Sequence, residues 1–294
     1  MRADSSSMRG WHEYARLMMA WVVAAALALI ALDAAAGIAN TKHNLVSSNA
    51  ANNRFAPTSG TAEICVFCHT PHAAALPGTP GAVAPLWNKA LPSSASYTLY
   101  DTSVSSTLDG ESIAVGSVSI ACLSCHDGSA AMNNMINAPG SGNFNSGGAI
   151  FAGTWTAGTG TASPVDPATG RLAARTATTG VGNLGVDLRD DHPIGIQYCG
   201  GGPTVATPAT ACRDSDFVAP SNTTISGNIV FWVDTGGAGR QKTDMILYNR
   251  PFATAGNGPS VECASCHDPH SDTNATFLRI SNAASAVCLA CHVK

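Results

Sequence analysis

The chain has 294 residues, only 12% of them charged, and its formal net charge is −4. A net acidic chain with few lysines is a poor match for nucleic acid, which is bound through clustered cations. Abundant small residues with so little charge predict a compact, loop-rich surface rather than a highly charged disordered chain. The 10 cysteines and 9 histidines point instead to metal, haem or disulfide chemistry.

The chain begins with a predicted secretion signal over residues 1–36. Three arginines precede an apolar run from Leu17 to Leu32, and Ala34-Ala35-Ala36 offers a cleavage site. The apolar run is shorter than the about 20 residues that a membrane span needs, which favours cleavage over a retained anchor. No later segment is long and apolar enough to cross a membrane. The mature protein is therefore expected outside the cytoplasm, without a stable membrane span.

Residues 37–130 carry two Cys-x-x-Cys-His motifs, Cys65-Val-Phe-Cys68-His69 and Cys122-Leu-Ser-Cys125-His126. This spacing is typical of covalent haem c attachment. The two thiols form thioethers with the vinyl groups of one haem, and the adjacent histidine reaches one face of the iron. The segment is interpreted as an N-terminal dihaem unit.

Residues 131–260 contain no such motif and form a predicted insertion. Their Gly, Ala and Thr content favours turns and short strands over helix. Residues 227–233 and 242–248 have strand character, and residues 234–240 between them predict a hairpin connection. Cys199 and Cys212 form an even leftover pair, which predicts a disulfide in a secreted protein and leaves two free thiols as the alternative.

Residues 261–294 carry two further motifs, Cys263-Ala-Ser-Cys266-His267 and Cys288-Leu-Ala-Cys291-His292. Four motifs in one chain predict four covalently bound haems c. Cysteine-rich zinc sites or a disulfide scaffold are the alternatives, but they would leave the histidine after each cysteine pair without a role. The chain also contains an internal repeat, because Cys263–His270 has the same pattern as Cys65–His72. Two dihaem units therefore flank the insertion.

Four histidines remain outside the leader and the motifs, namely His43, His72, His192 and His270. Four irons with a histidine on both faces would use all of them. No coordination position would then stay open, which favours electron transfer over substrate binding.

The sequence also predicts which iron each distal histidine serves. His72 and His270 follow a motif histidine by three residues, a tether too short to reach the other face of the same haem. The internal repeat assigns His72 to the second haem and His270 to the fourth. His192 is expected on the third or second haem, with Asp190 or Asp191 accepting its ring N–H. His43 either folds back to the first haem or reaches another subunit.

The expected fold is mostly irregular and loop-rich, with short helices, a few short β-strands and the haem chain as its core. The chain resembles secreted multihaem cytochromes, in particular the OmcE-like tetrahaem c-type cytochromes of the extracellular nanowire family. The resemblance is carried by the first three motifs, by Lys42-His43-Asn44-Leu45, Pro85-Leu-Trp-Asn88 and Tyr97-Thr-Leu-Tyr100, and by Asp191-His192-Pro193.

The resemblance implies a continuous chain of bis-histidine haems in a polymer of this subunit. It further implies one axial histidine donated between subunits, for which His43 is the first candidate. Such a protein would be exported through the periplasm to a cell-surface filament and would pass electrons to redox proteins or extracellular metal oxides without being an enzyme. A monomeric periplasmic or secreted tetrahaem carrier is the alternative, and a multihaem reductase, which needs an open iron site, is the third hypothesis.

Overall fold

The computed structural model describes residues 18–19, 37–58, 63–72, 74, 85–139, 144–176 and 181–293. The predicted secretion signal over residues 1–36 thus lies outside the described residues, apart from Met18 and Met19. The chain divides into Met1–Gly37 and Ile38–Lys294, and the description below concerns the second unit. Within the described ranges, no helix has the length and apolar character that crossing a membrane requires.

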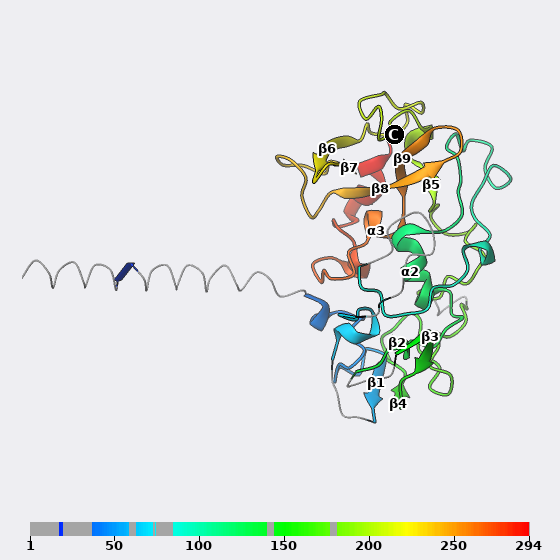
Figure 1. The fold of residues 1–294 in the computed structure, drawn as a ribbon, viewed down its shortest axis with the longest axis vertical. Helices are drawn as coiled ribbons and strands as arrows, with labels where there is room; N and C mark the ends of the chain where they lie inside the picture. The colour runs from blue at the N-terminus through cyan, green and yellow to red at the C-terminus, as the bar shows by residue number, and fades with distance from the viewer. Residues whose placement is uncertain are drawn as a thin grey trace, which may run out of the picture. The chain divides into compact units, whose positions relative to one another are not determined.

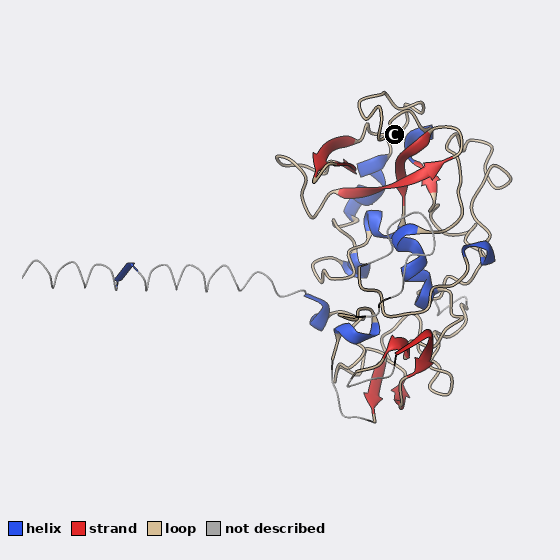
Figure 2. Ribbon diagram, viewed as in Figure 1, coloured by secondary structure: helices blue, strands red, loops and turns tan. Residues whose placement is uncertain are grey.

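Helices are short and sparse (Figure 2). All four Cys-x-x-Cys pairs lie on helical turns, namely η3 (Cys65–Phe67), α2 (Ser117–His126), α3 (Cys263–Cys266) and α4 (Ala286–Cys291). Residues three apart share one face of a helix, so each turn presents its two thiols on the same side. The remaining turns are η2 (Gly37–Asn40), η4 (Ser94–Ser96), η5 (Tyr198–Gly200), η6 (Ala275–Phe277) and η7 (Ala283–Ser285).

The strands form three antiparallel sheets in the described residues. β1 (Arg54–Pro57) pairs with β4 (Gly153–Thr156), and β2 (Asn134–Asn137) pairs with β3 (Phe144–Ile150). The third sheet has the order β5-β9-β8-β7-β6. Its strands are β5 (Ile196–Gln197), β6 (Ser221–Ile225), β7 (Asn228–Val233), β8 (Met245–Phe252) and β9 (Gly256–Val261).

The two strands expected from the insertion are present as β7 and β8, which pair through Phe231–Leu247 and Val233–Met245. Their inward residues are buried, with Phe231, Val233 and Met245 at 0% exposure. Burial of β-branched and aromatic side chains on one face is what stabilises such a sheet.

Apolar side chains gather in three separate clusters. One joins Phe55, Phe67, Met135 and Trp155 around the small sheets, a second surrounds Leu123 on α2, and a third surrounds Phe231 on the large sheet. In Figure 1 the small sheets lie at one end of the Ile38–Lys294 unit and the large sheet at the other, with α2 and α3 between them. The cysteine pairs therefore lie at the borders of the clusters.

Cys199 and Cys212 are joined by a disulfide. It closes the loop that follows β5, and the chain after it returns to the C-terminal end of α4. There the backbone N–H of Val218 donates to the carbonyl of Cys291, and the N–H of Val293 donates to the carbonyl of Asp216. The disulfide thus anchors the segment that supports the last Cys-x-x-Cys-His motif.

Candidate haem centres

The motif histidines are fixed by short backbone contacts to their own cysteines. The backbone N–H of His69 donates to the carbonyl of Cys65 at 2.8 Å, and that of His292 donates to the carbonyl of Cys288 at 2.9 Å. His267 bonds in the same way to Cys263 at 3.2 Å. These bonds close the turn, so the histidine leaves the helix directly behind the two thiols.

Three motif imidazoles are oriented by backbone carbonyls. Nδ1 lies 2.8 Å from the Pro85 carbonyl in His69, 2.5 Å from the Gly182 carbonyl in His126 and 2.7 Å from the Thr276 carbonyl in His267. A carbonyl can only accept, so Nδ1 must carry the proton and donate. The lone pair then lies on Nε2, which is the arrangement in which a metal-bound imidazole is normally held.

Two motif histidines face a second imidazole. The ring centroids of His69 and His270 are 6.0 Å apart with planes at 20°, and those of His126 and His43 are 6.0 Å apart with planes at 60°. Imidazoles on opposite faces of one metal, each bonded at about 2 Å, hold their ring centroids roughly 6 Å apart. The spacing of both pairs therefore fits two axial ligands of one iron.

His43 is partly buried between the second motif and the turn after the third. Its ring stacks on Phe277 at 4.3 Å and hydrogen-bonds to the backbone of Pro269. Burial lowers the pKa of His43 to about 3, with nearby His126 adding to the shift. A neutral imidazole is the form that binds a metal. The geometry differs from both sequence expectations for this residue, since His43 meets neither the first motif histidine nor the exterior.

His270 also lies elsewhere than expected. The internal repeat of Cys65–His72 in Cys263–His270 predicts that His270 serves the fourth haem, whereas the His270 ring faces His69 of the first motif. His292 of the fourth motif instead lies against Phe217, with ring centroids 4.5 Å apart. The cause is the folding of the chain, which brings the third motif back onto the first.

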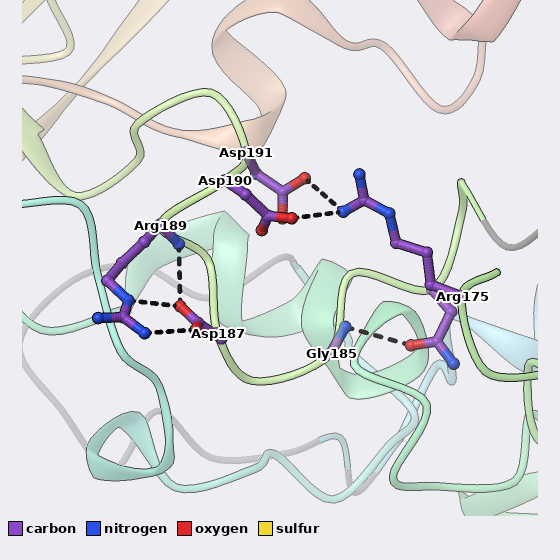
Figure 3. Close-up of polar contacts among 7 residues, drawn as sticks. Arg175, Gly185, Asp187, Arg189, Asp190 and Asp191 are labelled. Carbon is purple, nitrogen blue, oxygen red and sulfur yellow. Dashed lines mark hydrogen bonds and ion pairs between the residues drawn. The ribbon is translucent and has the colours of Figure 1, made fainter. Parts of the chain in front are cut away.

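His192 lies near the third and fourth motifs, and burial lowers its pKa while the closeness of His292 and His267 adds to the effect. Its Nδ1 is 3.1 Å from the Pro193 carbonyl. The expected support by Asp190 or Asp191 is wrong. Figure 3 shows both carboxylates turned to Arg175, at 3.1 Å and 3.7 Å from its Nη1.

The same close-up shows a second ion pair in this loop, Arg189 on Asp187 at 2.7 Å (Figure 3). Hydrogen bonds from Arg189 lower the pKa of Asp187 to about 2. Both side chains are about half exposed, so solvent screens their attraction and the pair adds little to stability. These charges shape the loop that carries His192 and do not hold its ring.

His72 is exposed, as are His192 and His270, whereas His43 is partly buried. The backbone carbonyl of His72 accepts hydrogen bonds from Thr70 and Asn137, which hold the loop beside β2. Within the part of the chain that the structure describes, no other ring lies against its imidazole. The structure does not bring His72 to His126, the motif histidine of the second haem.

The cysteines of the four motifs adjoin one another in chain order. Burial raises the pKa of Cys68 to about 12, and the neighbouring Cys125 sulfur adds to the shift. The Cys122 thiol hydrogen-bonds to Cys263, which raises the pKa of Cys122 and lowers that of Cys263. Burial raises the pKa of Cys291 to about 12, with Cys266 adding to it. The first site thus adjoins the second, the second the third, and the third the fourth.

Comparison with known families supports this chemistry. The family described as "Doubled CXXCH motif" matches residues 255–294, which contain the third and fourth motifs. The match indicates a multihaem cytochrome of the c type with covalently bound haem c, a class whose usual role is to carry electrons. No curated protein matches the chain.

The donor set fits haem rather than a bare ion. Among the described residues, no group of three or more His, Cys, Asp or Glu side chains is placed to hold a metal ion. The paired imidazoles would hold the iron from two sides, and a porphyrin would supply its other four ligands.

Proposed function

We propose that this chain transfers electrons through four bis-histidine haems c, as the subunit of an extracellular cytochrome filament. The observation that carries the proposal is the pairing of His69 with His270 and of His126 with His43, each at 6.0 Å between ring centroids. A motif histidine and a distant histidine meet at the spacing of two axial ligands, so no iron of these two sites has an open position for a substrate.

The haems supply the redox chemistry, and the chain positions and insulates them. The Cys68–Cys125, Cys122–Cys263 and Cys266–Cys291 neighbours place successive attachment sites side by side. Three apolar clusters border these sites. Backbone carbonyls hold the imidazoles, so little rearrangement accompanies a change of iron charge.

We assign the distal ligands of the third and fourth sites from the internal repeat. His270 lies three residues after the third motif histidine and faces the first motif histidine. It therefore serves the attachment site two places earlier in chain order than the motif it follows. Applied to His72, which follows the first motif, the same rule leads to the third haem of the preceding subunit. His192 then serves the fourth haem, consistent with its closeness to His292. His72 replaces His43 as the donated ligand.

A donated ligand of this kind makes subunits join head to tail. Contacts between two different surfaces of identical subunits generate open filaments when the rotation does not close. His72 lies beside β2, whereas His292 lies with the large-sheet cluster at the other end of the unit (Figure 1). Export through the periplasm and delivery of electrons to redox proteins or metal oxides complete the proposal.

Spin state and assembly test it together. The exported protein is isolated, its haem content is measured by pyridine haemochrome, and its spectrum is compared between sheared filaments and dispersed subunits. Four low-spin haems per chain in haem-stained filaments are expected, with one turning high-spin on dispersal. Four low-spin haems in particles that never polymerise would identify a monomeric carrier instead. A high-spin haem that persists in filaments would favour a reductase.

A further inference from the structure

The second and third attachment sites are joined by a buried polar network centred on Glu262. Its side chain is fully buried, at 0% exposure, and forms an ion pair with Arg250, whose side chain is 6% exposed. Glu262 immediately precedes Cys263 and caps α3, where its backbone N–H donates to the Ser265 hydroxyl oxygen at 2.9 Å.

The network reaches across to the helix of the second site. The Ser119 hydroxyl of α2 donates to Oε2 of Glu262 at 2.5 Å and accepts the backbone N–H of Cys263 at 3.0 Å. One serine therefore bonds both the carboxylate and the first residue of the neighbouring motif. Ser119 has 0% exposure, so water does not compete for either bond.

Arg250 ties β8 to the segment that leads into α2. Its Nη2 donates to the Ala114 carbonyl at 2.7 Å. A Cβ at Gly116 would come within 2.7 Å of the same nitrogen, so glycine leaves the space that the guanidinium fills. The carboxylate is further bonded by the Ser260 hydroxyl at 3.2 Å. Three segments distant in sequence thus meet on one ion pair.

These hydrogen bonds lie where the N-terminal and C-terminal dihaem units meet. Cys122 lies one helical turn after Ser119 on α2, and its sulfur lies beside Cys263. A buried ion pair adds little net stability compared with apolar side chains, because desolvation offsets the attraction. What a buried, hydrogen-bonded pair can add is a fixed geometry.

We propose that Glu262 is a positioning residue that locks the second and third attachment sites edge to edge, so that electrons cross between the two dihaem units at Cys122 and Cys263. The inference rests on the proposed electron-transfer function and assigns a role to residues that bind no haem. The negative charge of Glu262 has a second effect, because it neutralises the Arg250 guanidinium, which would otherwise lie unpaired beside two redox centres.

Two variants separate geometry from charge in the haem-loaded protein. Ser119→Ala keeps both charges and removes the bridge between α2 and α3. Glu262→Gln keeps the side-chain size and leaves Arg250 without its counter-ion. Ser117→Ala is the matched control, since Ser117 is also buried on α2 but its hydroxyl lies outside the network.

The readouts are the electron paramagnetic resonance coupling between ferric haems, the rate of internal electron exchange after photoreduction, and the reduction potentials. Ser119→Ala should weaken the coupling and slow exchange several-fold with little change in potential. Glu262→Gln should do the same and also raise the potential of the adjacent haems, because an unpaired cation favours the reduced iron. Ser117→Ala should match the unchanged protein.

Unchanged coupling, rate and potentials in both variants, at full haem content, would overturn the inference. Full haem loading of Ser119→Ala supplies the test even where Glu262→Gln does not fold. Failure of the proposed function itself would look different, because the unchanged protein would then lack low-spin haems.

Discussion

At the scale of single residues, Lys89 is a buried cation beside the first attachment site. It is 3% exposed, and its ammonium donates to the carbonyls of Met132 at 2.7 Å and Asn134 at 3.1 Å. Its charge lowers the pKa of Cys68, opposing the larger effect of burial. In the described residues no carboxylate forms an ion pair with it. A charge of this kind acts strongly on a neighbouring redox centre, because the protein interior screens it poorly.

Lys89→Met should therefore lower the reduction potential of one haem, since loss of the cation removes stabilisation of the reduced iron. Spectroelectrochemical titration measures this as one component that moves to lower potential. Lys242→Met, at an exposed position, is the control and should leave all components in place. An unchanged titration of Lys89→Met would show that the ammonium serves only to hold the two carbonyls.

His43 provides a second prediction at this scale. Its replacement by Ala should leave His126 as the lone axial ligand of the second haem, so that one low-spin haem becomes high-spin within the isolated subunit. Magnetic circular dichroism and electron paramagnetic resonance report the change. Added imidazole should restore the low-spin signal, because it can occupy the vacated position. Retention of the low-spin spectrum without imidazole would remove His43 from the ligand set.

At the scale of elements, the disulfide Cys199–Cys212 anchors residues 213–218, which bond to the end of α4. The bridged residues are 13 apart in sequence, and loop-entropy reasoning gives about 3 kcal/mol for a loop of this size. The Cys199→Ser/Cys212→Ser double variant should lose about that much unfolding free energy, measured by urea denaturation with haems attached. Reductant should destabilise the parent equally and leave the double variant unaffected. An equal urea midpoint in both proteins would show that the segment is held without the bridge.

Some elements could be predicted from sequence because their signals are local. The strands β7 and β8 have β-branched and aromatic residues on a buried face, and each haem motif is a short contiguous pattern. The helix α2 was missed, since its ten residues Ser117–His126 include three serines and bury residues all round rather than along one stripe. Its stability comes from packing against Tyr97 and Leu188, far along the chain. Such tertiary packing leaves no helical period to read.

The distal ligands show the same limit. Counting histidines predicts four of them, but their partners depend on how the third motif folds back onto the first. The carbonyls of Pro85, Gly182 and Thr276 that orient the rings carry no sequence signal, because every residue has a carbonyl. Asp190 and Asp191 looked suitable beside His192, yet Arg175, distant by about fifteen positions, competes for them. Long-range electrostatic competition of this kind is invisible in a local motif.

At the scale of the whole molecule, the row of sites within one chain begins at the first motif and ends at the fourth. A filament requires the fourth site of one subunit to adjoin the first site of the next, and His72 is an exposed histidine three residues after the first motif histidine. The ligand that crosses the interface then also fixes the distance between subunits. Electron transfer and assembly would depend on the same side chain.

His72→Ala separates these two consequences. The variant should export with four haems attached, since every cysteine pair and motif histidine is unchanged, but it should form no filaments in negative-stain electron microscopy. Its third haem should be high-spin, as in dispersed subunits of the parent protein. Imidazole should return that haem to low spin without restoring filaments, because a free ligand cannot link two chains. His43→Ala is the matched comparison: it should lose one low-spin haem within the subunit yet keep the exposed His72 with which to polymerise. Filaments of normal length from His72→Ala would show that the interface is held by other contacts and would return the donated ligand to another histidine.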